Sequence, residues 1–269
     1  MKKCCIMLIV LLLTLICNMG FAADISTGVI TVEGTSNANQ PAPNGYLAAK
    51  MDAQRNMLTE INGINIDAES TMEQFLLVSD VVKAKVQGLL KGAKVVNRYK
   101  DNEGYHVTLE IPVYGNGSIA ESVMPAYLDD MAQANLGDVV DAYDVREDIF
   151  SNSQDSVVAS TDKYTGLIID CSGLDIGTAM SPSIYSSSNK LLNRHATQDR
   201  DMVIKRGILG YANGFDDNLS RAGSNPLVVR AVEIRHFVCP VVSDEDADRI
   251  SSADRISGFI VKGNVIIIK

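Results

Sequence analysis

The chain has 269 residues, of which 46% are hydrophobic and 21% are charged. This composition excludes a largely disordered chain, and the length fits one large domain or two small ones of roughly 100–200 residues each. The formal net charge of −9 argues against nucleic acid or anionic lipid as a partner, because neutralising phosphates needs clustered Lys and Arg.

Residues 1–22 are predicted to form a signal peptide. A basic start at residues 2–3 precedes an apolar run over 6–16, which is too short to cross about 30 Å of hydrocarbon. Cleavage is expected between Ala22 and Ala23. Lipidation of Cys17 is the alternative, but the residues before it do not fit a lipoprotein signal. We therefore expect an exported protein of the bacterial periplasm or cell envelope, with no transmembrane span after cleavage and no outer-membrane lipid anchor.

The first predicted elements are a strand over 29–35 and, after a polar turn-rich joint, an amphipathic helix over 46–61. A strand over 64–70 and a second helix over 74–91 follow, with Gly92 at the position of a terminating glycine. Both Thr71, paired with Gln74, and Ser79 are candidate caps for that helix. The expected core face of the first helix consists of apolar residues at three- and four-residue spacing: Leu47, Ala48, Met51, Met57, Leu58 and Ile61.

Strands over 95–99 and 105–111, separated by a polar turn, are predicted to form a hairpin. The pattern β-α-β-α-β-β assigns residues 23–119 to one α+β module, with two helices on a mainly antiparallel sheet. The fold class predicted for the whole chain is α+β.

Residues 120–162 are predicted to be an acidic linker. Between 121 and 155 there are nine acidic residues and one basic residue, Arg146, and a segment with this charge extends by its own repulsion. Five apolar residues could form a short helical stripe: Val123, Met124, Tyr127, Leu128 and Met131. A calcium site is the alternative, but no alternating D-x-D-x-D-G loop is present.

Residues 163–269 are predicted to form a second, small α+β domain. A near-continuous apolar run over 164–170 is typical of a strand covered on both faces. Further strands are expected over 208–211, 227–238 and 264–268, with a short helix that begins at Ser243 and ends near Asp254.

Cys171 and Cys239 are the two cysteines that remain after signal cleavage. In an oxidising compartment they could form a disulfide, worth roughly 4 kcal/mol by chain entropy. The alternative is two buried, unpaired thiols that pack as small apolar side chains. Neither cysteine has a second Cys or His at metal-ligand spacing, so we predict no metal site.

Side chains that could support catalysis do not form a recognisable group. His106, His195 and His236 have no partner at short ligand spacing, and we interpret them as ordinary strand or surface residues. Asp170 follows an apolar strand, where open α/β sheets place active residues, but a turn-forming role in Asp170–Gly173 explains it as well. The sequence therefore predicts no catalytic, cofactor-binding or metal-binding residue and no enzymatic activity.

Four segments carry a family resemblance: AAKMDAQR at 48–55, SDVV at 79–82, GAKVVNRY at 92–99 and VTLEIP at 107–112. Through them, residues 48–115 resemble the family of small twenty-kilodalton outer-membrane lipoproteins that includes the flagellar envelope protein FlgP. The resemblance implies a bacterial envelope protein that assembles with copies of itself or with flagellar proteins. It supplies no catalytic residues. This chain differs from the family in having no convincing lipidation cysteine.

Two functions are open at this point. The first is a non-enzymatic envelope protein that acts in assembly or protein–protein interaction, as a homo-oligomer or with flagellar partners. The second is a periplasmic binding module for a small envelope ligand, either a glycan or a peptide.

Overall fold

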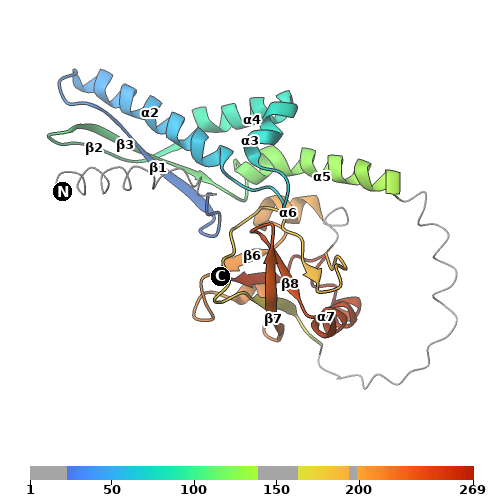
Figure 1. Ribbon diagram of the computed structural model, residues 1–269. Helices are drawn as coiled ribbons and strands as arrows, with labels where there is room; N and C mark the ends of the chain where they lie inside the picture. The colour runs from blue at the N-terminus through green and yellow to red at the C-terminus, as the bar shows by residue number, and fades with distance from the viewer. Residues whose placement is uncertain (1–22, 139–162, 194–198) are drawn as a thin grey trace, which may run out of the picture.

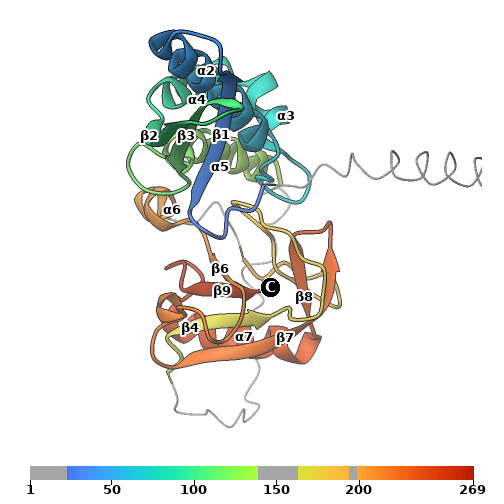
Figure 2. The same ribbon diagram turned by 90° about the vertical axis from the view of Figure 1, so that its left-hand side faces the viewer.

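The computed structural model describes residues 23–138, 163–193 and 199–269. A three-stranded sheet with helices occupies the N-terminal part, and a six-stranded sheet with its own helix occupies the C-terminal part. Figure 2 shows these two modules stacked on one another. The α+β class is as predicted. The signal-peptide prediction concerns residues 1–22, which lie outside the described part of the chain.

The N-terminal sheet is antiparallel, with strand order β1-β3-β2. Its strands are β1 (Val29–Asn37), β2 (Lys94–Lys100) and β3 (Gly104–Pro112), so the first strand and the hairpin are confirmed. The predicted strand over 64–70 is wrong. There Asn65 forms isolated bridges and no continuous strand, because the Asp67 carboxylate accepts hydrogen bonds from the N–H groups of Glu69 and Ser70 and folds the chain into a turn.

Three helices precede the hairpin: α2 (Ala42–Asn62), α3 (Met72–Val78) and α4 (Asp80–Lys91). The single helix predicted over 74–91 is therefore two helices, broken at Ser79, whose φ of −124° and ψ of 99° are extended. Both predicted caps form, and each serves its own helix. Thr71 and Gln74 make a capping box at the start of α3, while the Ser79 side chain accepts a hydrogen bond from the backbone of α4.

Helix α2 runs along the sheet (Figure 1), and it buries a different face from the one predicted. The buried residues recur mainly at four-residue spacing and are mostly small: Gly45, Ala49, Ala53, Met57 and Ile61. Leu47, Met51 and Leu58, which the sequence placed in the core, are exposed. The reason is the close approach of helix and strand: a Cβ on Gly34 of β1 would lie 2.0 Å from the Ala53 backbone nitrogen, so the contact excludes large side chains.

The first part of the linker predicted over 120–162 is helical. Residues Ile119–Asp138 form helix α5, and six of its apolar side chains are buried in the N-terminal core: Ile119, Ala120, Val123, Met124, Tyr127 and Leu128. Met131 packs partly against the same core. The apolar stripe therefore outweighs the charge of this segment. Residues 139–162 lie outside the described part, and with them the part of the acidic segment considered for calcium that follows Asp138.

The C-terminal sheet is mixed, with strand order β5-β8-β7-β4-β9-β6. Helix α7 (Asp244–Ser257) buries Ala247 and Ile250 in the core of this module. Its Ser243 cap is as predicted. The strands are β4 (Gly166–Asp170), β5 (Tyr185–Ser186), β6 (Gly210–Ala212), β7 (Pro226–Arg235), β8 (Cys239–Val242) and β9 (Val265–Ile268), and helix α6 (Arg200–Arg206) and the 3-10 helix η3 (Ser220–Ala222) connect them.

The strand predicted over 227–238 is confirmed as β7, but it ends at Arg235, and the strand β8 that follows the turn was not predicted. The chain reverses at His236 and Phe237, which have positive φ values of 49° and 64°. Two consecutive positive φ values define a tight hairpin turn that normally carries Asn or Gly. No such residue marks this turn, which is why the sequence pattern did not predict it.

The disulfide predicted as one alternative is absent, because Cys171 and Cys239 are both buried free thiols. Cys171 follows β4 and Cys239 begins β8, and β7 lies between these two strands. Two strand spacings amount to about 9.5 Å, whereas a disulfide needs Cα atoms within about 7 Å. Burial raises the pKa of the Cys171 thiol to about 12, which keeps it protonated.

The two modules are joined by backbone pairing. Asn65 forms a parallel bridge with Ala179, and the N–H of Ser181 donates to the Ile66 carbonyl at 2.7 Å. Val203 of α6 is buried in the core of the N-terminal module. The N-terminal and C-terminal modules are therefore in direct contact, through backbone hydrogen bonds and through a shared part of the core.

Candidate functional site

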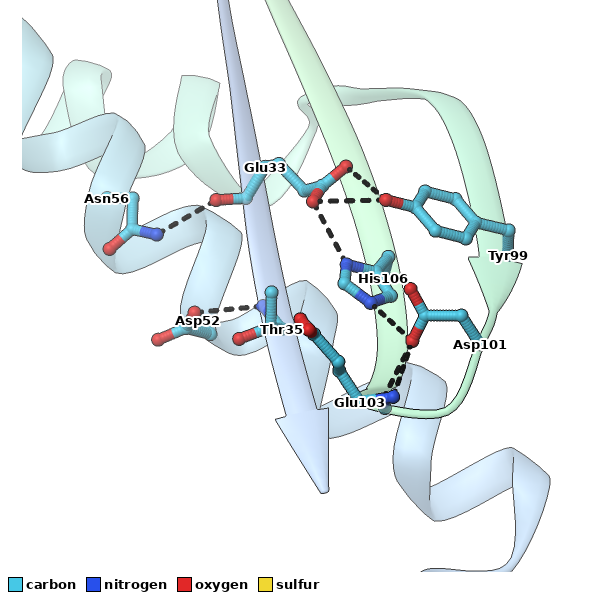
Figure 3. Close-up of polar contacts among 9 residues, drawn as sticks. Glu33, Thr35, Asp52, Asn56, Tyr99, Asp101, Glu103 and His106 are labelled. Carbon is cyan, nitrogen blue, oxygen red and sulfur yellow. Dashed lines mark hydrogen bonds and ion pairs between the residues drawn. The ribbon is translucent and has the colours of Figure 1, made fainter. Parts of the chain in front are cut away.

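The most organised polar cluster lies on the face of the N-terminal sheet opposite α2, and its centre is His106 of β3. Nδ1 of His106 lies 3.0 Å from Glu33 Oε1 of β1, and Nε2 lies 3.1 Å from Asp101 Oδ1 in the hairpin loop. Figure 3 shows the imidazole between the two carboxylates. Alternation along β1 and β3 produces this arrangement, because residues opposite one another on a face are cross-strand neighbours.

The cluster is a buried ring between partly exposed acids. The side chain of His106 is 8% exposed, whereas Glu33 and Asp101 are 40% and 44% exposed. The hydrogen bond with Glu33, aided by that with Asp101, raises the pKa of His106 above its ordinary 6.5. The N–H groups of Gly104 and Glu103 and the bond with His106 lower the pKa of Asp101 below 3.8. A neutral imidazole can donate from only one nitrogen, so the geometry favours the imidazolium.

Tyr99 of β2 completes the cluster. Its ring stacks on His106 with centroids 4.3 Å apart and planes 2° apart, and its hydroxyl donates to Glu33 at 3.3 Å. Partial burial and the Glu33 carboxylate raise the pKa of Tyr99 above 10.0. The cluster thereby ties together all three strands and the hairpin loop.

A surface hollow of about 480 Å³ opens beside this cluster, at the hairpin end of the sheet. Its lining is mostly uncharged and polar: Thr35, Ser36, Asn37, Ala38, Asn39, Asn102, Glu103 and His106. Hydroxyl and amide groups of this kind can donate and accept hydrogen bonds to a small polar ligand.

The chemistry open to His106 is limited, because both ring nitrogens are already engaged. A general base or a metal ligand needs a free ring nitrogen. Across residues 23–138, 163–193 and 199–269, no three His, Cys, Asp or Glu side chains are placed to hold a metal ion. The cluster is therefore suited to hold strands together.

The other residues singled out from the sequence do not join this cluster. Oδ1 of Asp170 accepts a hydrogen bond from the Ser172 N–H at 2.9 Å, so Asp170 forms the turn that was one of its two interpretations. His236 lies in the β7–β8 turn, and His195 lies outside the described residues. The sequence did not predict the His106 cluster, because its members are far apart in the chain. The one available signal was strand alternation, which places Glu33, Tyr99 and His106 on the outward face of their strands.

Comparison with known proteins concerns the other module. A family model described as the second domain of Treponema pallidum Tp0624 matches residues 166–269. The C-terminal module is similar to that domain. The match starts with β4 and runs to the last residue, so it covers the whole six-stranded sheet. No curated protein matches the chain in sequence.

None of the helices among the described residues has the length and apolar character needed to cross a membrane.

The His106 cluster predicts a specific pH dependence of stability. Because the pKa of His106 is raised in the folded state, its stabilisation is complete below about pH 6.5 and is lost as pH rises through the folded value. The lowered pKa of Asp101 gives a contribution that is complete above about pH 4 and is lost as pH falls further. Urea denaturation should therefore show a free energy of unfolding that falls as pH rises above about 6.5.

The same pH series of urea denaturation, repeated on two variants, shows whether His106 causes the fall in the free energy of unfolding. His106→Gln should remove the fall, because glutamine does not titrate. His236→Gln changes an exposed histidine at the β7–β8 turn and should leave the fall intact. A fall of equal size in His106→Gln would contradict the assignment.

Proposed function

We propose that this protein is an exported, non-enzymatic component of the bacterial cell envelope that acts in assembly through protein–protein association. The observation that carries the proposal is an apolar surface on the helices of the N-terminal module. At the junction of α3 and α4, Leu77, Val78 and Val81 are 78%, 79% and 66% exposed. Contiguous exposed apolar residues of this kind mark protein interaction sites.

A second group of exposed apolar side chains lies on α2. Leu47 and Met51 are one helical turn apart and are 59% and 62% exposed, and Leu58 shares their side of the helix. Because the opposite face of α2 packs on the sheet, this helix presents apolar residues in two directions. Only one of them is used within the folded chain, which supports a role in association.

Sedimentation velocity over a range of concentrations tests the proposal with the chain itself as the partner. We expect an oligomer whose fraction rises with concentration. The double variant Leu77→Gln/Val78→Gln should reduce association without lowering the melting temperature, because both side chains are already in solvent. Val228→Gln/Val232→Gln, which changes exposed valines on β7, is the matched control. A strict monomer at high concentration would contradict self-assembly.

A flagellar setting for this function rests on the resemblance over residues 48–115. It is tested by swimming in soft agar of a strain that lacks the gene, with the deletion complemented in trans. Loss of swimming that the complementing copy restores is the expected result. Normal swimming would remove the flagellar setting and leave envelope association to be tested as above.

The second candidate function is a binding module for a small envelope ligand, and the polar hollow beside His106 is the observation that favours it. Soluble glycan fragments and short peptides should then raise the melting temperature, because a ligand that binds only the folded state stabilises it. Asn102→Ala and Asn39→Ala, which shorten side chains that line the hollow, should abolish the rise. No rise with any fragment would favour assembly.

A further inference from the structure

The two edges of the N-terminal sheet differ in their backbone hydrogen bonding. At the β1 edge, the Asp52 carboxylate of α2 accepts a hydrogen bond from the Thr35 N–H at 2.9 Å, and the Asn56 side chain donates to the Glu33 carbonyl at 2.9 Å. Figure 3 shows both contacts reaching β1 from α2. Because side chains of α2 occupy these two backbone groups in the middle of the strand, they obstruct the pairing of a further strand at the β1 edge.

The β2 edge is open. All seven residues of β2 are exposed, and among the described residues no side chain forms a hydrogen bond with the β2 backbone. An edge strand leaves alternate N–H and C=O groups pointing away from the sheet, where they can pair with another strand. A bulge between Val95 and Asn97 interrupts the pairing of β2 with β3, and pairing continues to Lys100.

The β2 edge is also basic in an acidic protein. Lys94, Arg98 and Lys100 belong to this one strand, and none of them forms an ion pair with a described residue. Arg98 and Lys100 instead lie over the rings of Tyr46 and Tyr105, at 5.8 Å and 4.7 Å from the ring centroids. All three charged side chains of β2 are therefore basic on a chain whose net charge is −9, while the neighbouring acidic residues, Glu110 opposite Lys94 and Asp101 after Lys100, lie outside the strand.

We propose that β2 is the docking site for an extended, acidic segment of a partner protein, which adds to the sheet as a fourth strand. The main-chain groups of the edge would supply affinity, and the charges would select the partner. A second copy of β2 is a poor occupant, because it would bring three cations against three cations, and like charges on paired strands repel. The inference rests on the proposed function and adds to it the place and the chemistry of the partner.

The test uses two fluorescein-labelled synthetic peptides, one alternating valine with glutamate and the other alternating valine with lysine. Fluorescence anisotropy should show that the full chain binds the acidic peptide at least about tenfold more tightly than the basic one. The preference should weaken with added salt, because exposed charges are screened. Amide hydrogen exchange should slow in β2 on binding of the acidic peptide and remain unchanged in β1.

Charge reversal separates recognition from folding. Arg98→Glu/Lys100→Glu should invert the preference, so that this variant binds the basic peptide more tightly. The control Lys83→Glu/Lys85→Glu makes the same change in net charge on exposed positions of α4 and should keep the wild-type preference. The far-UV circular dichroism spectrum of each variant should match that of the wild type, so that an inverted preference cannot arise from unfolding.

Three results would overturn the proposal: no binding of the acidic peptide, an equal effect of both reversals, or slowed exchange outside β2. In the first case the lysines and the bulge would serve only to protect the edge against aggregation. Self-association abolished by Arg98→Glu/Lys100→Glu would identify a second copy as the occupant. Self-association that depends on Leu77 and Val78, together with no peptide binding, would leave the proposed function standing and reject this inference alone.

Discussion

Replacing Gly34 with valine is expected to lower the free energy of unfolding by about 3 kcal/mol. The glycine lies where β1 crosses α2, and a Cβ there would lie 2.0 Å from the Ala53 nitrogen and 2.4 Å from the Ala49 carbonyl oxygen. Both atoms belong to the helix backbone, so a rotamer change cannot relieve the clash. The helix and strand would have to separate, which would open the core between them. Urea denaturation followed by circular dichroism measures the loss.

A second glycine provides the matched control. Gly88 lies inside α4, and a Cβ there would meet nothing within 4 Å. Gly88→Ala should therefore stabilise the protein, by about 0.5–1 kcal/mol, because alanine has the higher helix propensity. If Gly34→Val unfolded at the urea concentration of the wild type, the close contact of β1 with α2 would be wrong.

Replacing Arg221 with leucine is expected to cost about 3 kcal/mol or more, in the C-terminal module. Arg221 Nε donates to the Gly263 carbonyl at 2.7 Å and Nη2 donates to the Gly207 carbonyl at 2.6 Å, while Nη1 donates to the Arg206 carbonyl. Burial lowers the pKa of this guanidinium to about 10, which leaves it charged at neutral pH. Hydrogen bonds from a charged donor contribute about 1.5–3 kcal/mol each, and leucine would leave three carbonyls without that donor.

Two further variants test whether the loss of stability in Arg221→Leu comes from its hydrogen bonds with the three carbonyls. Arg221→Lys keeps the charge but cannot reach three carbonyls with one planar group, so it should recover only part of the stability. Arg249→Leu removes an exposed arginine that pairs with Asp246 within α7 and should change the stability by less than about 1 kcal/mol. Equal losses in Arg221→Leu and Arg249→Leu would show that the carbonyl contacts contribute little.

Both predictions concern positions that connect elements far apart in the chain. Gly34 sets the distance between the first strand and the first helix, and Arg221 joins the end of α6 to the start of β9. The residue type alone does not single out either position. Gly34 is one of 20 glycines, and no sequence motif distinguishes Gly34 or Arg221 from other residues of the same type. Their importance follows from what lies beside them in the fold.

The His106 cluster shows the same limit for the candidate site. Glu33, Tyr99, Asp101 and His106 come from three strands and one loop, and the antiparallel register of β1 and β2 with β3 brings them together. The alternation within each strand was predicted from the sequence. The register across strands depends on the whole sheet, so the sequence could not show that two carboxylates bracket the histidine.

The sequence by itself determined the local structure. The α+β class, the hairpin β2–β3, the caps at Thr71, Ser79 and Ser243 and the apolar stripe of α5 were all readable, because each depends on residues a few positions apart. These signals act within one turn or one strand pair, and nothing distant in the fold reverses them.

The tertiary structure alone decided which surfaces are used. Leu47 and Met51 are more apolar than Ala49 and Ala53, yet the alanines face the core because Gly34 admits only small side chains at that crossing. The β7–β8 turn forms at His236 and Phe237 because strand pairing on both sides holds two residues at positive φ. In each case packing between distant segments outweighs the local preference of the residues, and that packing also leaves Leu47 and Met51 of α2 and the whole of β2 exposed.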